Sequence, residues 1–107
     1  MSALNITSEQ DFSERVLKSQ KTVLVDFFAT WCGPCKMAGP EVEAVGVAMA
    51  DKASVVQVNI DEQPGLASRY NVKAVPTFLV IKGGQEVNRF TGFRTRKDLQ
   101  AAIEAAQ

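Results

Sequence analysis

The chain has 107 residues, and its 12 basic and 12 acidic side chains cancel to a formal net charge of zero at pH 7. This length suits one domain, spanning residues 1–107, with one hydrophobic core and no room for a separate cofactor domain. The balanced charge gives no argument for nucleic acid binding, and no apolar run approaches the ~20 residues that a membrane-spanning helix needs.

The first half of the chain predicts strands that alternate with helices. Leu4 and Ile6 alternate as a short first strand, and residues 7–10 have the pattern of a capping box that opens a helix. Residues 23–29 are almost continuously apolar, which is typical of a central strand covered on both faces. We expect the helix that follows the cysteines to extend to about Ala50.

The second half of the chain ends in a hairpin and a helix. Residues 55–60 predict another buried strand, and a short helix follows it. Residues 77–81 and 86–90 flank Gly83-Gly84, which is a hairpin pattern. The last helix starts near Thr95 and has amphipathic spacing. This order of elements predicts the α/β class, with a mixed sheet and helices on both of its faces.

The only two cysteines, Cys32 and Cys35, lie at the predicted junction between a strand and a helix. A disulfide between them closes a ring too short to stabilise a fold through chain entropy. A structural zinc site needs about four Cys or His ligands, and the chain has two Cys and no His. Reversible thiol–disulfide chemistry is therefore favoured over an incidental pair of small buried residues.

The helix N-terminus predicts different roles for the two thiols. Unpaired N–H groups and the helix dipole should lower the pKa of Cys32 and make it the nucleophile. Cys35, one turn into the helix, is expected to be more enclosed and to resolve the mixed disulfide. Between them, Gly33 and Pro34 are expected to tune the redox poise, because proline stiffens the ring and removes a donor.

Asp26 interrupts the central apolar strand. By the alternation of side chains it shares a face with Leu24 and Phe28, which predicts burial beneath the following helix. A buried carboxyl without a charged partner tends to take up a proton, so Asp26 is a candidate proton acceptor for Cys35. The alternative is an aspartate that is hydrogen-bonded to backbone at a strand end, and the strand pattern leaves both open.

Four other residues also have two readings from local evidence. The bond before Pro76 is expected to be trans from the base rate of about 5–6% cis. Pro40 either kinks the helix or marks a helix that begins later, at Glu41. Trp31 is more often a core residue than a contact surface, and Gly92 is consistent with an ordinary strand end.

Taken together, these segments resemble the thioredoxin family over essentially the whole chain. The resemblance implies the thioredoxin fold, a central five-stranded mixed sheet flanked by four helices, and the activity of a general protein disulfide reductase. The segments that carry it are Asp26–Met37 with its Trp-Cys-Gly-Pro-Cys core, Val58-Asn59-Ile60-Asp61, Val75-Pro76-Thr77 and Gly92.

The resemblance also implies roles for the residues that were left open. It implies that Asp26 is the buried acid, that Pro40 kinks the helix, and that Pro76 follows a cis bond and packs against the dithiol. The backbone before Pro76 would then pair with an extended client segment. The residues that it places on the client-binding rim are Trp31, Gly33, Pro34, Ala74, Val75, Pro76 and Gly92.

The implied partners are disulfide-containing client proteins and a flavin-dependent, NADPH-using thioredoxin reductase as electron donor. No cofactor or metal would be bound, and the redox group would be the Cys32–Cys35 disulfide itself. We expect the protein to be a monomer. We also expect it to lie in the cytoplasm, since the N-terminus has no secretory signal pattern. A second enzymatic alternative is a disulfide oxidant or isomerase of an exported compartment. Members of that class usually have His in place of Pro34 and carry export signals, and this sequence shows neither. A non-catalytic binding subunit or processivity module on the same fold is a further alternative.

Four positions depart from the common bacterial pattern. Phe28 replaces a second tryptophan, and Gln57 replaces a buried lysine near the acid. Ala74 replaces a glycine beside the proline, and Phe93 adds bulk next to Gly92. The last two are expected to narrow the client groove.

Overall fold

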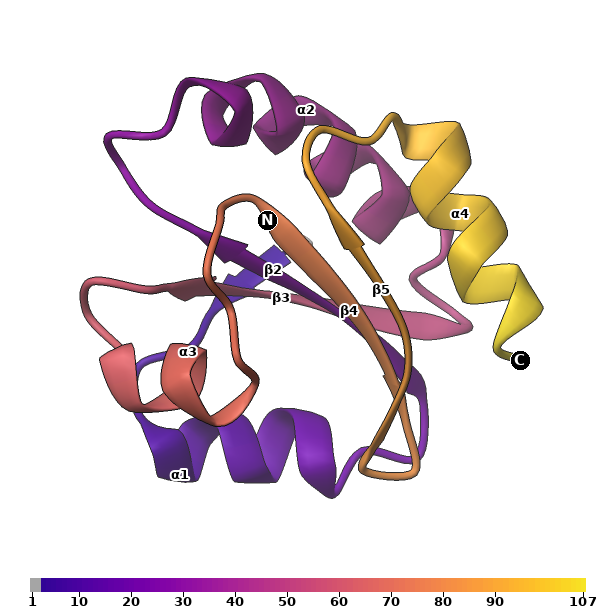
Figure 1. Cartoon of the computed structure of the whole chain (residues 1–107). Helices are drawn as coiled ribbons and strands as arrows, with labels where there is room; N and C mark the ends of the chain where they lie inside the picture. Colours follow the sequence, from indigo (N-terminus) through magenta and orange to yellow (C-terminus); the bar gives the residue numbers. More distant parts are fainter. Residues whose placement is uncertain (1–2) are drawn as a thin grey trace.

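Five strands form one mixed sheet in the computed structural model, which describes residues 3–107 (Figure 1). The strand order is β1-β3-β2-β4-β5. The first three strands in this order are mutually parallel, and β4 is antiparallel to both of its neighbours, β2 and β5. The strands are β1 (Ala3–Asn5), β2 (Thr22–Phe28), β3 (Ala53–Asn59), β4 (Thr77–Lys82) and β5 (Gln85–Thr91).

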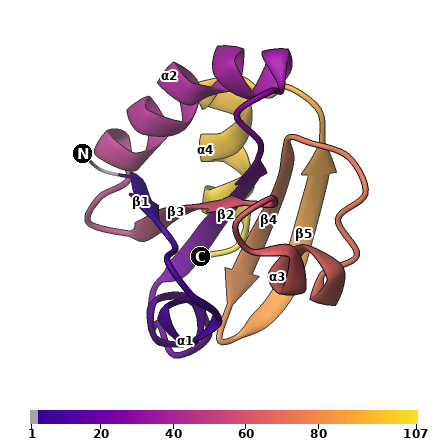
Figure 2. The ribbon, with the colours of Figure 1, turned by 90° about the vertical axis from the view of Figure 1, so that its left-hand side faces the viewer.

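Helices cover both faces of this sheet, as the sequence predicts. Figure 2 shows α1 and α3 on one face and α2 and α4 on the other. Within residues 3–107, each helix is too short or too polar to cross a lipid bilayer. The helices are α1 (Glu9–Phe12), which continues as a π-helical segment over Ser13–Leu17, then α2 (Gly33–Ala48), α3 (Pro64–Arg69) and α4 (Arg96–Ala105).

Strand β2 lies at the centre of the sheet and carries the functional junction at its carboxyl end. Successive side chains of a strand point to opposite faces. Leu24 accordingly packs with α2 and α4, while Val25 and Phe27 pack with α1 and α3. Both faces are buried, which explains the nearly continuous apolar run.

Three predicted boundaries are wrong by one or two residues. Edge strand β1 ends at Asn5 and does not include Ile6. The first helix is capped by Ser8, whose hydroxyl accepts from the Asp11 backbone N–H at 2.9 Å, and the Asp11 carboxylate accepts from the Thr7 N–H. Thr7 precedes the N-cap, so this pair of hydrogen bonds differs from the capping box that was predicted. Helix α2 ends at Ala48 rather than near residue 50.

Pro40 lies inside α2, so the alternative of a helix that begins at Glu41 is wrong. Proline has no N–H to donate to the carbonyl four residues earlier, which weakens the helix at this point. Helix α2 continues because Ala38 and Val42, on either side of the proline, are fully buried against the sheet. Packing therefore holds the helix together across the interruption.

Candidate active site

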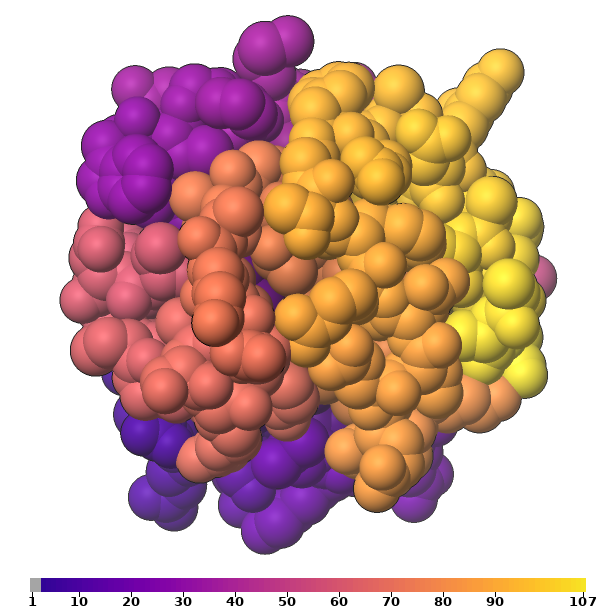
Figure 3. Space-filling view, viewed as in Figure 1, coloured from indigo at the N-terminus to yellow at the C-terminus, as the bar shows by residue number. Residues whose placement is uncertain are grey.

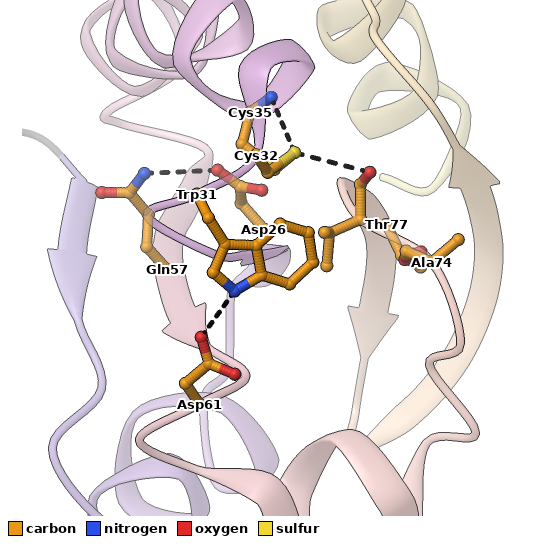
Figure 4. The surroundings of a disulfide bond; sticks show 9 residues. Asp26, Trp31, Cys32, Cys35, Gln57, Asp61, Ala74 and Thr77 are labelled. Atoms are coloured by element: carbon orange, nitrogen blue, oxygen red, sulfur yellow. Dashed lines mark hydrogen bonds between the residues drawn. A yellow bond between two sulfur atoms is a disulfide. The ribbon is translucent and has the colours of Figure 1, made fainter.

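The two cysteines form a disulfide at the N-terminus of α2, with their Cα atoms 5.2 Å apart (Figure 4). Cys32 is the N-cap residue, and its extended backbone (φ −91°, ψ 112°) turns the chain into the helix that begins at Gly33. Pro34 occupies the first turn, where its missing N–H costs nothing. The Cys35 backbone N–H donates to Cys32 Sγ at 3.1 Å. This arrangement stabilises negative charge on Cys32 when the disulfide opens.

Exposure does not separate the two cysteines in the disulfide form. Cys32 is 5% exposed and Cys35 is 8% exposed, so the expectation that Cys35 is the more enclosed residue is wrong. Cys32 is covered because Ala29 and Val75 pack against the disulfide. The Cys32 sulfur lies 3.6 Å from the Val75 carbonyl oxygen.

The loop before β4 packs against the disulfide and is held by hydrogen bonds. The Val75–Pro76 bond is cis, as the family resemblance implied and against the local base rate. The Thr77 hydroxyl donates to the Ala74 carbonyl at 2.6 Å, and the Gly92 N–H donates to the Pro76 carbonyl at 2.8 Å. These contacts place the backbone of Val75 beside the reactive sulfur.

Trp31 lies on the surface, 67% exposed, so the reading of Trp31 as a core residue is wrong. Its indole N–H donates to Asp61 Oδ2 at 2.9 Å (Figure 4). Asn59 fixes this carboxylate, because its side-chain oxygen accepts from the backbone N–H groups of Asp61 and Glu62. From the sequence Asp61 was named only as part of a segment that carries the family resemblance, with no role in the site. The signal was the Asn-x-Asp spacing that follows a strand, which is typical of an Asx turn.

Gly92 follows β5 with φ +98°, a conformation that L side chains rarely adopt. It is therefore more than an ordinary strand end. Phe93, the next residue in the chain, is 38% exposed. Figure 3 shows the purple segment around residue 32, the orange segment around residue 75 and the yellow-orange segment around residue 92 meeting on one face.

Substituting Gly92 with alanine is expected to lower the free energy of unfolding by about 1–2 kcal/mol. The nearest atom to an added Cβ is Arg94 Nη1 at 3.8 Å, so the cost is conformational rather than steric. Gly39→Ala is the matched control: Gly39 lies inside α2 with nothing within 4 Å of an added Cβ, and alanine there should stabilise. Urea unfolding of both variants checks this, and equal effects of one sign would contradict it.

Asp26 is buried in the middle of β2, 2% exposed, and not at a strand end. Gln57 Nε2 donates to Asp26 Oδ2 at 3.2 Å, while Oδ1 has no hydrogen-bond partner among residues 3–107. Burial raises the pKa of Asp26 to about 6, and the hydrogen bond from Gln57 partly opposes the shift. The reading of Asp26 as a backbone-bound strand-end residue is therefore wrong.

Asp26 and Cys35 face the same hollow of about 290 Å³ beside α2. Its wall is largely apolar, and the Asp26–Gln57 pair lies next to the disulfide in Figure 4. No group of three or more His, Cys, Asp or Glu side chains in the described part of the chain is placed to hold a metal ion. The residues that line the hollow are Asp26, Phe28, Ala29, Thr30, Cys35, Lys36 and Gln57.

A disulfide at a helix N-terminus, packed against a cis-proline loop on this mixed sheet, defines the class of dithiol–disulfide oxidoreductases. Comparison with known proteins agrees with this class. The family model for thioredoxin matches residues 3–105. The chain therefore belongs to the thioredoxin family, and it is a protein-disulfide oxidoreductase.

The similarity extends over nearly the full length of the chain. It is 41% identical to the thioredoxin of Synechocystis sp., across 97% of each protein. It is 39% identical to the mitochondrial thioredoxin of Mus musculus, across 97% of this chain and 63% of the mouse protein. The crystal structure of a Malassezia sympodialis thioredoxin superimposes with a TM-score of 0.87 at 38% identity, covering 96% of this chain and 89% of that one.

Proposed function

We propose that the chain acts as a single thioredoxin domain that reduces disulfides in a range of client proteins. The observation that carries this proposal is the position of Cys32 as the N-cap of α2, with the Cys35 N–H directed at its sulfur. In the reduced protein these groups favour the thiolate, which is the attacking form in disulfide exchange.

In the first step the Cys32 thiolate attacks one sulfur of a client disulfide. A Cys32–client disulfide forms, and the other client sulfur leaves as a thiolate that takes a proton from solvent. In the second step Cys35 loses its proton and attacks the sulfur of Cys32. The remaining client sulfur leaves as a second thiolate, and Cys32 and Cys35 end as the disulfide, having given up two electrons.

Asp26 is the proposed acceptor of the Cys35 proton. Both residues face the hollow beside α2, and the pKa of Asp26 is raised to about 6. An acid of this strength is ionised at neutral pH and yet holds a proton well enough to take part in transfer. The hollow is the proposed route by which the proton is later released to solvent.

Clients are proposed to bind as extended segments across the rim of the active site. The carbonyl of Val75 lies beside the Cys32 sulfur, where it can accept a backbone hydrogen bond from the segment. Exposed Trp31 provides apolar contact area on the other side. The rim as proposed consists of Trp31, Gly33, Pro34, Ala74, Val75, Pro76 and Gly92, with Gly33 and Pro34 also tuning the redox poise.

The electron donor is proposed to be a thioredoxin reductase that uses NADPH and a flavin, so this chain needs no bound cofactor beyond its own dithiol. Working as a reductase requires a reducing compartment, and the cytoplasm is the compartment proposed here. The mouse relative is named as mitochondrial, so cell fractionation is the direct test of this point. The protein is proposed to act as a monomer.

The test of the reductase function is turnover of insulin disulfides with NADPH and a thioredoxin reductase. Wild-type protein should catalyse NADPH oxidation, and Cys32→Ser should lose at least about 10³-fold in kcat/KM because the nucleophile is gone. Asp51→Asn, on an exposed turn, is the control and should match the wild type. Undetectable turnover by the wild type would favour the non-catalytic binding module instead.

A further inference from the structure

Gln57 is the only residue of the described chain with a hydrogen bond to the carboxyl group of Asp26. The two residues are register partners on the parallel strands β2 and β3, so the backbone sets their separation. Both line the hollow of about 290 Å³ beside the disulfide. Figure 4 shows the Gln57 amide directed at Asp26.

A carboxyl group that takes up and releases a proton changes its hydrogen-bonding demand. The ionised form only accepts hydrogen bonds, whereas the protonated form also donates one through its O–H. Glutamine carries an NH₂ donor and a carbonyl acceptor on one planar group of nearly symmetrical shape. Half a turn about the last side-chain bond exchanges donor and acceptor, and the hollow beside Gln57 gives it room.

We propose that Gln57 is a positioning residue for proton transfer. Its amide N–H donates to ionised Asp26, and the amide rotates by half a turn so that its carbonyl accepts from protonated Asp26. The inference rests on the proposed role of Asp26 as proton acceptor. A lysine at this position could only donate and would favour the ionised form alone. The neutral amide of Gln57 instead forms a hydrogen bond with either protonation state of Asp26 during the catalytic cycle.

The other groups that face Asp26 leave this role to Gln57. On β4 the register partner of Asp26 is Phe78, which is apolar, and α4 contributes apolar side chains to the same core. On α2 the titratable or charged residues that line the hollow are Cys35, held in the disulfide, and Lys36, whose residue is exposed to solvent. The Gln57 amide is therefore the main polar group that responds to a change in the protonation state of Asp26.

NMR titration of the oxidised protein between pH 4 and 9 tests whether the Gln57 amide changes its hydrogen bonding when Asp26 takes up a proton. The Gln57 side-chain ¹⁵N, amide proton and carbonyl ¹³C resonances should shift with the same midpoint as the Asp26 carboxyl ¹³C. The transition should vanish at Gln57 in Asp26→Asn, and exposed Gln85 should show no such transition. Gln57 resonances that stay constant while Asp26 titrates would overturn the proposal.

The rate of mixed-disulfide resolution, measured by stopped flow across the same pH range, gives a second readout. Gln57→Met keeps the length of the side chain without donor or acceptor, and it should slow resolution by about three- to tenfold, as for one lost neutral hydrogen bond. Gln57→Lys should move the pH dependence to lower pH. A Gln57→Met profile identical to the wild type would show that Gln57 is only a spacer.

Asp26→Asn distinguishes a failure of the proposed role of Asp26 from a failure of the proposed role of Gln57. If it leaves the resolution rate unchanged, the proposed role of Asp26 is wrong, and this inference falls with it. If it slows resolution while the Gln57 resonances ignore the titration of Asp26, the role of Asp26 stands and only the inference about Gln57 fails.

Discussion

Replacing Cys35 with serine is expected to convert the protein into a trap for its clients. Cys32 keeps its place at the helix N-terminus, so it still attacks client disulfides and forms the mixed disulfide. The second step is then impossible, because serine cannot displace the client sulfur. Clients should accumulate as adducts that survive non-reducing electrophoresis and are released by dithiothreitol, and catalytic turnover should fall by at least about 10³-fold.

The reverse variant, Cys32→Ser, is the matched control for the trap. It removes the thiol beside the Val75 carbonyl and leaves Cys35, whose sulfur has no helix cap of this kind. Captured protein should be almost absent under native conditions. Equal capture by the two variants would contradict the assignment of Cys32 as nucleophile and Cys35 as resolving thiol.

The Asp26→Asn variant, in which a neutral amide replaces the buried carboxyl group, is expected to be more stable than the wild type at neutral pH. The folded pKa of Asp26 is about 6, against an unfolded value of about 3.9. This difference corresponds to roughly 2–3 kcal/mol of destabilisation once the carboxyl is ionised. Asparagine stays neutral, and its carbonyl can still accept from Gln57.

The sign of the pH dependence follows from the raised folded pKa. The contribution of Asp26 to stability is fully present below the unfolded value of about 3.9, where the carboxyl is protonated in both states. It is lost as the pH rises through the folded value of about 6. The stability advantage of Asp26→Asn should therefore be small near pH 3.5, grow between pH 4 and 6, and reach its full size above pH 7.

Urea unfolding of the oxidised proteins at several pH values measures this difference. Asp51→Asn removes an exposed carboxyl and should show no such rise between pH 4 and 6. A constant difference between Asp26→Asn and wild type across the range would mean that Asp26 has the same pKa folded and unfolded. The same variant should reduce disulfides roughly ten- to a hundredfold more slowly, because Cys35 loses its proton acceptor.

The order of elements and the reactive pair could be predicted from the sequence, because both rest on local patterns. The apolar run of β2, the glycines of the hairpin and the stripe of α4 report burial and turn geometry through neighbouring residues. The Cys-Gly-Pro-Cys spacing likewise places both thiols within one helical turn. The exact caps and ends were missed where side chains compete over one or two positions, as Ser8 does with Thr7.

The surroundings of the pair were decided by tertiary structure, since they join residues far apart in the chain. Asp26 meets Gln57 across 31 positions, and Trp31 meets Asp61 across 30. Local evidence left Trp31 between core and surface, and only the packing of the loops shows that it is exposed and held by a carboxylate.

The Val75 carbonyl reaches Cys32 across 43 positions, through a cis bond that local base rates oppose. Resemblance to a family anticipated that bond, but the residues around it did not. Chemistry carried by adjacent residues can be read from the sequence, because the spacing of the chain alone brings the groups together. The burial of Asp26 and the partner of each polar group depend on which strands pair and which loops pack, and these long-range contacts exist only in the folded chain.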